Sequence, residues 1–246
     1  MKNAVLAVSF LTALASGTAA AHADHYSLGS RDWSGVYIAG SVGYGIADAE
    51  DEITLDGSTF SGVISSHPDA DGVTGTVAIG YDRQLDSHFV AGVFADYTFG
   101  ELDGSGTRVY PNGDAFRFNL EYDNAWAIGA RLGYTRSEHT LWYVTAGYTE
   151  ADLSYSDQFG SVDKDLQGFF LGAGVEHNIR DNFFLKLEYR YSNYGDETIF
   201  EDTATSGPCG TECYEREDID TDIHSIRLGI AYKFGGPAPA APAPLK

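Results

Sequence analysis

Seven histidines are the residues of this chain best suited to acid–base or metal chemistry, but their spacing supports neither. They are His22, His25, His67, His88, His139, His177 and His224. None has the spacing of a Ser–His–acid triad, and the sequence holds no G-x-S-x-G elbow, paired metal histidines or phosphate loop. The sequence therefore predicts no enzyme, no cofactor and no metal site. His67 leaves one alternative, because a histidine in a long connection could be the axial ligand of a haem receptor.

A second set of reactive groups consists of acids and bases that alternate with apolar residues. The set is Asp82, Asp96, Glu121, Asp123, Glu176, Glu188, Arg131, Lys186, Arg190, Arg227 and Lys233. If the segments that carry them closed into a barrel, this set would line the interior with nearly balanced charge. Buried charges persist when they are paired and hydrogen-bonded. We predict an ionic network that fills the interior, with a narrow gated pore whose ion pairs exchange partners as the alternative.

The N-terminus indicates the compartment in which these groups work. Residues 1–23 contain one lysine, a short apolar run and the small-x-small sequence Ala21-His22-Ala23, which predicts a secretory signal peptide. The apolar run is too short to span a membrane. In an oxidising envelope, Cys209 and Cys213 of the sequence GPCGTEC are expected to form a small disulfide within one loop.

Eight segments with strand-like alternation must position the charged set. They cover residues 36–46, 72–82, 89–100, 118–134, 141–155, 169–179, 183–194 and 224–234. In each, apolar residues occupy one face, opposite small or polar residues. The fourth segment places Phe118, Leu120 and Tyr122 on its apolar face, opposite Glu121 and Asp123, so these three residues are expected to face outward from the barrel. The facing of the fifth is ambiguous, because Leu141 competes with Trp142.

The connections between these segments alternate in length. Residues 48–71, 101–117 and 196–219 are long, 156–166 intermediate, and 83–87, 135–140 and 180–182 short. A soluble sandwich or lipocalin also alternates. The aromatic residues near both strand ends and the glycine-rich polar face favour a membrane protein. We predict an all-β fold: an eight-stranded antiparallel up-and-down transmembrane β-barrel with long extracellular loops and short periplasmic turns.

The formal net charge of −21 argues against a nucleic-acid partner. Most of this charge lies in the first and last long connections. Acids there could hold divalent cations that also bridge anionic lipopolysaccharide, although a solvated surface is the simpler interpretation. No run matches an EF-hand loop, so no metal ligands are assigned.

Several motifs resemble a known family. They are Asp32–Gly40 (DWSGVYIAG), Leu171–Glu176 (LGAGVE), the turn at Asp181 and Asn182, Lys186–Tyr191 (KLEYRY) and Arg227–Phe234 (RLGIAYKF). They are similar to small eight-stranded outer-membrane proteins of alphaproteobacteria, within the OmpA and opacity-protein superfamily. The resemblance covers residues 33–234. It implies a place in the outer membrane of a Gram-negative bacterium among lipid and lipopolysaccharide, assembly by the barrel-insertion machinery and a role in envelope integrity. Members are commonly described as porin-like.

An eight-stranded barrel is just wide enough to be filled by its own side chains. The expected function is therefore that of a structural, surface-exposed barrel, with a small gated channel and a haem or ligand receptor as alternatives. Its last strand ends on Tyr232 and Phe234, which resemble the family's carboxy-terminal insertion signal. The chain is thus divided into a signal peptide (1–23), a periplasmic segment (24–32), a barrel (33–234) and a Pro/Ala-rich periplasmic tail (235–246). The tail resembles linkers that lead to peptidoglycan-binding domains, which makes peptidoglycan a candidate partner.

Overall fold

The computed structural model describes residues 32–110, 113, 115–158, 160–207 and 209–234, so the predicted signal peptide and tail lie outside the described residues. Ten strands make up this part of the chain: β1 Gly35–Asp56, β2 Ser61–Ser66, β3 Asp69–Gln84, β4 Phe89–Phe99, β5 Leu102–Val109, β6 Ala115–Ser137, β7 Thr140–Asp157, β8 Ser161–Arg180, β9 Phe183–Gly207 and β10 Gly210–Phe234. Among these residues, no helix is long and apolar enough to cross a membrane.

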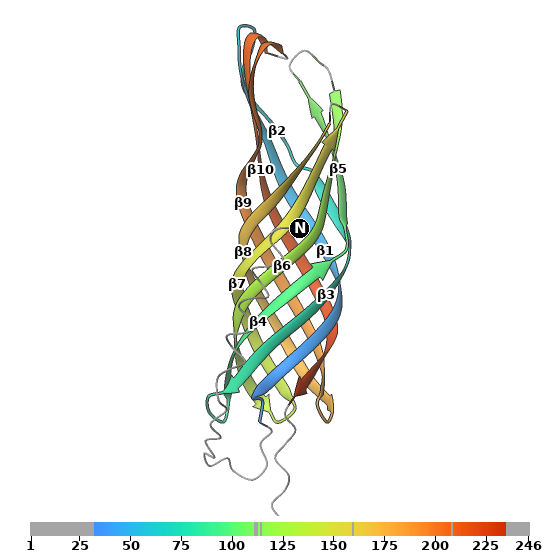
Figure 1. Ribbon diagram of the computed structural model, residues 1–246, viewed down its shortest axis with the longest axis vertical. Helices are drawn as coiled ribbons and strands as arrows, with labels where there is room; N and C mark the ends of the chain where they lie inside the picture. The colour runs from blue at the N-terminus through green and yellow to red at the C-terminus, as the bar shows by residue number, and fades with distance from the viewer. Residues whose placement is uncertain (1–31, 111–112, 114, 159, 208, 235–246) are drawn as a thin grey trace, which may run out of the picture. The chain divides into compact units, whose positions relative to one another are not determined.

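Eight of the ten strands form a closed antiparallel ring. In order around it, the strands are β1, β10, β9, β8, β7, β6, β4 and β3, and β3 pairs with β1 to complete the circle. Figure 1 shows these strands tilted around the lower part of the molecule. The predicted eight-stranded up-and-down fold is confirmed, and β2 and β5 are additional short strands at one end.

The ring keeps its apolar side chains outside. Val42 is 65% exposed and Leu228 56% exposed. The same pattern settles the facing of β7, where Trp142 is 56% exposed and Leu141 is fully buried. An apolar exterior around a polar interior is the arrangement of a barrel that crosses a bilayer.

Glycine on the inner face makes room for aromatic rings inside the barrel. A Cβ atom at Gly80 would lie 2.5 Å from the ring of Tyr37, and one at Gly174 would overlap the ring of Tyr143. Both tyrosines are buried. The small residues of the inner face therefore make room for bulky aromatic neighbours inside the barrel.

The long connections are built differently from the prediction, because strands continue through most of them. β1 runs to Asp56, and β9 and β10 extend to Gly207 and Gly210. The predicted strand ends were therefore wrong at this end of the barrel. The physical reason is that apolar residues alternate with the acids there, and Ile53, Leu55 and Ile219 are buried.

Beyond the ring, these extended strands divide into two leaves. β3 begins at Asp69, and β8 pairs with β9 only as far as Phe169 and Asn193. The first leaf comprises β2 and the outer ends of β1, β10 and β9, and the second comprises β5 and the outer ends of β6, β7 and β8. They form the two prongs at the top of Figure 1. A hydrophobic core lies between them, formed by residues such as Phe118, Leu153, Leu166, Ile199 and Ile219.

A β-bulge in β6 reverses the inside and outside faces of that strand. Tyr122 pairs with Leu153 of β7 and Ala125 with Ala151, so β6 carries one extra residue between these pairs. As a result Phe118, Leu120 and Tyr122 point inward, and their predicted outward facing was wrong. The same reversal turns Glu121 and Asp123 outward.

Candidate functional site

The inside of the ring near the short turns holds a charge-balanced group, the short-turn cluster of Asp82, Arg131, Glu176 and Lys233. The Arg131 Nε atom donates to Asp82 Oδ1 at 2.7 Å, and its Nη1 atom donates to Glu176 Oε1 at 2.6 Å. Lys233 Nζ lies 2.6 Å from Asp82 Oδ2 and 3.7 Å from Glu176 Oε2. All four residues are buried, so two acids and two bases neutralise each other across β3, β6, β8 and β10.

Aromatic rings pack against this cluster. The Arg131 guanidinium lies 4.7 Å from the centre of the Tyr37 ring and 5.2 Å from that of Tyr143. Lys233 Nζ lies 4.9 Å from the centre of the Trp33 ring. Trp33 in turn packs against Phe184 and closes this end of the interior.

Halfway along the barrel lies the mid-barrel cluster, formed by Asp96, Lys186, Glu188, Arg190 and Arg227. The Arg190 Nη2 atom donates to Asp96 Oδ2 at 2.6 Å and to Glu188 Oε1 at 3.1 Å. Lys186 Nζ lies 2.9 Å from Glu188 Oε2, and Arg227 Nη1 lies 4.0 Å from Asp96 Oδ2. The charged groups therefore lie across the interior from β4 to β9 and β10.

The space left beside the mid-barrel cluster is very small. It amounts to about 10 Å³ and is lined by residues of the cluster together with Ala39, Ser41, Thr76 and Ala78. A cavity needs roughly 10–15 Å³ to hold one water molecule. At this level the space beside the cluster has room for about one water.

The structure places the predicted network residues in two groups. Nine lie in the two clusters, namely Asp82, Asp96, Arg131, Glu176, Lys186, Glu188, Arg190, Arg227 and Lys233. Glu121 and Asp123 do not join them, which corrects the prediction. Glu121 instead lies with Glu101 and Asp103, and the carboxylate oxygens of these three residues lie within 4.8 Å of one another. The neighbouring Asp123 raises the pKa of Glu121. The bulge in β6 is the cause.

Between the leaves lies a third buried ionic group, which the sequence analysis missed. Arg108 of β5 donates from Nη2 to Asp51 Oδ2 of β1 and to Glu217 Oε1 of β10, each at 2.7 Å. We call these residues the interleaf triad. Arg108 falls in a connection that was predicted to be a loop, so its side chain was not expected to be buried. The strand-like alternation of Gly104, Gly106 and Arg108 was the available signal.

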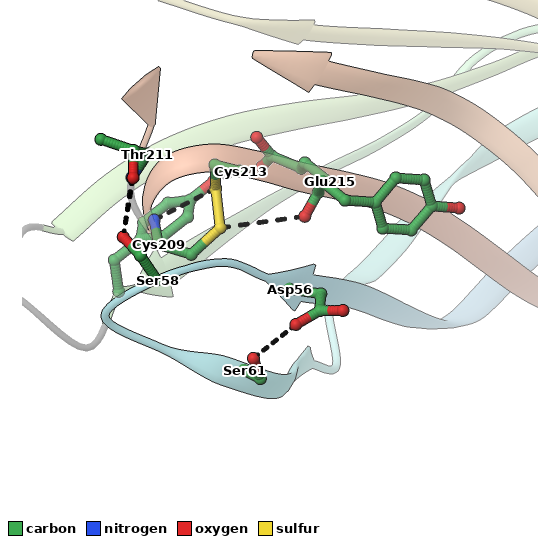
Figure 2. The surroundings of a disulfide bond; sticks show 9 residues. Asp56, Ser58, Ser61, Cys209, Thr211, Cys213 and Glu215 are labelled. Carbon is green, nitrogen blue, oxygen red and sulfur yellow. Dashed lines mark hydrogen bonds between the residues drawn. A yellow bond between two sulfur atoms is a disulfide. The ribbon is translucent and has the colours of Figure 1, made fainter. Parts of the chain in front are cut away.

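At the tip of the first leaf, Cys209 and Cys213 form the predicted disulfide. Figure 2 shows it beside the β1–β2 hairpin, where the Thr211 backbone N–H donates to Ser58 Oγ at 3.0 Å. The Thr59 N–H donates to the Cys209 carbonyl, also at 3.0 Å. Both cysteines pack with Ile53 and Leu55 in a small apolar cluster. The disulfide therefore belongs to a joint between two hairpins.

His67 lies on the surface, with Nε2 3.5 Å from Glu50 Oε1 and a side chain that is 70% exposed. It borders a shallow hollow of about 350 Å³ lined mainly by polar residues, among them Ser66, Asp69, Ser105 and Thr107. Haem binds in pockets lined largely by apolar side chains. Because this hollow is lined mainly by polar residues, it does not suit haem.

Tyr232 and Phe234 lie on the outward face of β10 beside Phe183. The Tyr232 ring centre is 4.9 Å from that of Phe234 and 5.0 Å from that of Phe183. They form an aromatic group at the short-turn end, where aromatic residues of membrane barrels meet the interface.

Comparison with known proteins gives a consistent result. Residues 9–234 match the family described as "Outer membrane protein beta-barrel domain". The 31 kDa outer-membrane immunogenic protein of Brucella melitensis is 26% identical, over 82% of this chain and 84% of that protein. The 25 kDa outer-membrane immunogenic protein of Brucella abortus is 30% identical, over 82% and 79%. The outer membrane protein OprG from Pseudomonas aeruginosa has a similar fold, with a TM-score of 0.53, 13% identity, and coverage of 83% of this chain and 98% of that chain.

Proposed function

Because this chain belongs to the outer-membrane β-barrel protein family, we propose that it is a structural, surface-exposed barrel that supports the envelope and keeps its lumen closed. The filled interior carries this proposal. Two ionic clusters and the rings of Trp33, Tyr37 and Tyr143 occupy the barrel, and the space beside the mid-barrel cluster is about 10 Å³. A barrel with such an interior can contact other molecules through its outer wall and through its two exposed ends.

The outer wall and the leaves suit different surroundings. The exposed apolar residues of the ring contact lipid, and the leaves extend from the cell with many acids on their surface. Divalent cations between these acids and lipopolysaccharide phosphates would join the protein to the outer leaflet. In this proposal Tyr232 and Phe234 serve the barrel-insertion machinery, and peptidoglycan is a candidate partner of residues 235–246, which lie outside the described residues.

The proposal includes no catalysis. The described histidines are dispersed: His177 accepts or donates a hydrogen bond with Thr140 and lies at the short turns, whereas His224 contacts Tyr189 at the opposite end of the ring. Neither arrangement supplies the serine, histidine and acid that acyl transfer needs in one place.

A small gated channel is the second candidate, and one observation favours it. The small space at mid-barrel is lined by charged side chains, and Lys186, at 16% side-chain exposure, is the least buried of them. Ion pairs that exchange partners would widen that space.

Conductance in planar lipid bilayers distinguishes the two functions. We expect the purified protein to stay at the background level, and Asp202→Asn, which alters an exposed acid, to behave in the same way. Stepwise conductance that changes in Asp96→Asn but not in Asp202→Asn would establish a channel through the mid-barrel cluster. For the structural role, cells that lack the protein should become more sensitive to detergent, and the Asp202→Asn variant should restore resistance.

A further inference from the structure

The two leaves are held together near their outer ends by side chains. Among the described residues, β5 pairs through its backbone with β6 and, at two positions, with β3, but with no strand of the first leaf. Arg108 reaches from β5 to Asp51 and Glu217, and all three side chains are at most 8% exposed. Beside the hydrophobic core, hydrogen bonds between Tyr122 and Thr221 at 2.9 Å and between Tyr110 and Glu215 at 3.1 Å also cross the gap. The interleaf triad is the buried ionic contact between the leaves.

The charges of the triad do not balance. Two carboxyl groups share one guanidinium, so full ionisation leaves one negative charge in excess in a buried place. Asp51 Oδ2 also accepts a hydrogen bond from Ser66, whereas the buried Asp51 Oδ1 has no partner among the described residues. A proton held between Asp51 and Glu217 cancels the excess and supplies a hydrogen bond that two ionised carboxylates cannot form.

We propose that the interleaf triad is a proton-operated clamp. A proton shared by Asp51 and Glu217 holds the leaves together, and its loss loosens them and admits water to the core between them.

The direction of the pH effect follows from the surroundings of Glu217. Burial raises the pKa of Glu217 to about 7, against an opposing effect of Arg108 and with a further rise caused by Asp51. In open leaves the carboxyl returns toward its usual value of 4.5. The closed leaves therefore bind more protons between pH 4.5 and 7, so the proton's contribution to closure is fully present below pH 4.5 and is lost as the pH rises through 7. The difference between a pKa of about 7 in closed leaves and 4.5 in open leaves limits the effect to about 300-fold in the closing equilibrium.

The other groups that face the triad do not titrate in this range. Tyr155 of β7 has its pKa raised by burial, and that of Tyr110, which follows β5, is raised to about 12 for the same reason. Phe118 of β6 lies under the Arg108 guanidinium, with the ring centre 5.1 Å away. Arginine stays charged throughout. The pH response is thereby assigned to the Asp51–Glu217 pair.

A distance measurement across the gap tests the clamp. Spin labels on Val63→Cys of β2 and Val109→Cys of β5 replace exposed side chains on opposite leaves. Cys209 and Cys213 remain paired under non-reducing conditions. In the full chain in lipid nanodiscs, we expect one narrow distance at pH 5.5 and a longer, broader distribution at pH 8.5. In the Glu217→Gln background, whose neutral amide resembles the protonated acid, the narrow distance should persist at both pH values.

Glu212→Gln is the matched control, because Glu212 is an exposed acid of the same strand and should leave the pH response unchanged. Hydrogen exchange of β5 and β10 in the unlabelled protein, corrected for the intrinsic effect of pH, should rise at least tenfold over the same range and remain flat in Glu217→Gln. Distances and exchange rates independent of pH, or a response retained in Glu217→Gln, would overturn the proposal.

Discussion

Arg131 illustrates how single residues inside this barrel depend on their partners. It donates to Asp82 and Glu176 and lies between the rings of Tyr37 and Tyr143. Taking one partner away from a buried ionic group is more costly than never forming the group, because the remaining charges stay buried. The effect of losing Arg131 on stability is thus set by the buried charges of Asp82 and Glu176 that would remain.

Replacing Arg131 with methionine should destabilise the barrel by about 3 kcal/mol, because Lys233 alone then neutralises two buried carboxylates. The readout is the urea concentration at which the protein unfolds in detergent. Arg136→Met, on the same strand but exposed, should unfold at nearly the wild-type concentration. Equal midpoints for the two variants would contradict a structural role for the short-turn cluster.

The alternation of residue types along the strands predicted part of this chemistry. Asp96, Arg190 and their neighbours were placed inside because strand alternation is strict where one face is apolar. Glu121 was misplaced because one extra residue in β6 reverses that alternation, and a bulge has no clear signature in a single sequence. Arg108 was missed because its surroundings come from β1 and β10, which are distant in the chain.

At the level of the elements, the ends of the strands were harder to predict than their number. The acids at Asp218 and Asp220 suggested a solvated loop, although Ile219 between them is buried. An outward acid and an inward apolar residue give the same alternation as any half-buried strand. In this stretch the negative charge favours a solvated loop, whereas the period of two favours a strand.

The disulfide at the tip should stabilise one element and not the whole barrel. Closing so short a loop is worth about 2 kcal/mol in the chain-entropy account. The double substitution Cys209→Ser and Cys213→Ser should speed hydrogen exchange in residues 57–60, since Ser58 and Thr59 bond to the clipped turn. Exchange in the ring portion of β8 serves as the internal control and should not change. Equal acceleration in both regions would show that the tip and the ring unfold together.

At the scale of the whole molecule, two arrangements are joined. The ring is inside out relative to a soluble domain, with apolar side chains on its outer face and ionic groups in its interior, whereas the leaves enclose a hydrophobic core. The closed circle of β1, β3 and their neighbours leaves no free edge within the ring, which makes such barrels resistant to stepwise unfolding.

Electrophoresis with and without boiling tests this closure. In detergent the unboiled protein should migrate as a compact form and the boiled protein as an unfolded one, because a closed ring has no free edge strand at which unfolding can begin. The control is a sample denatured in urea before loading, which should match the boiled form. Identical mobility before and after boiling would contradict a closed ring.

The division into leaves has a consequence for how this protein can diverge. The hairpin between Asp56 and Ser61 lies in the first leaf, beyond the closed ring, so its length does not affect the tilt or stagger of the ring. Alternation has a period of two, and a gain of one residue in a strand would exchange buried and exposed faces. Natural length variants of the leaves are therefore expected to gain or lose residues in pairs.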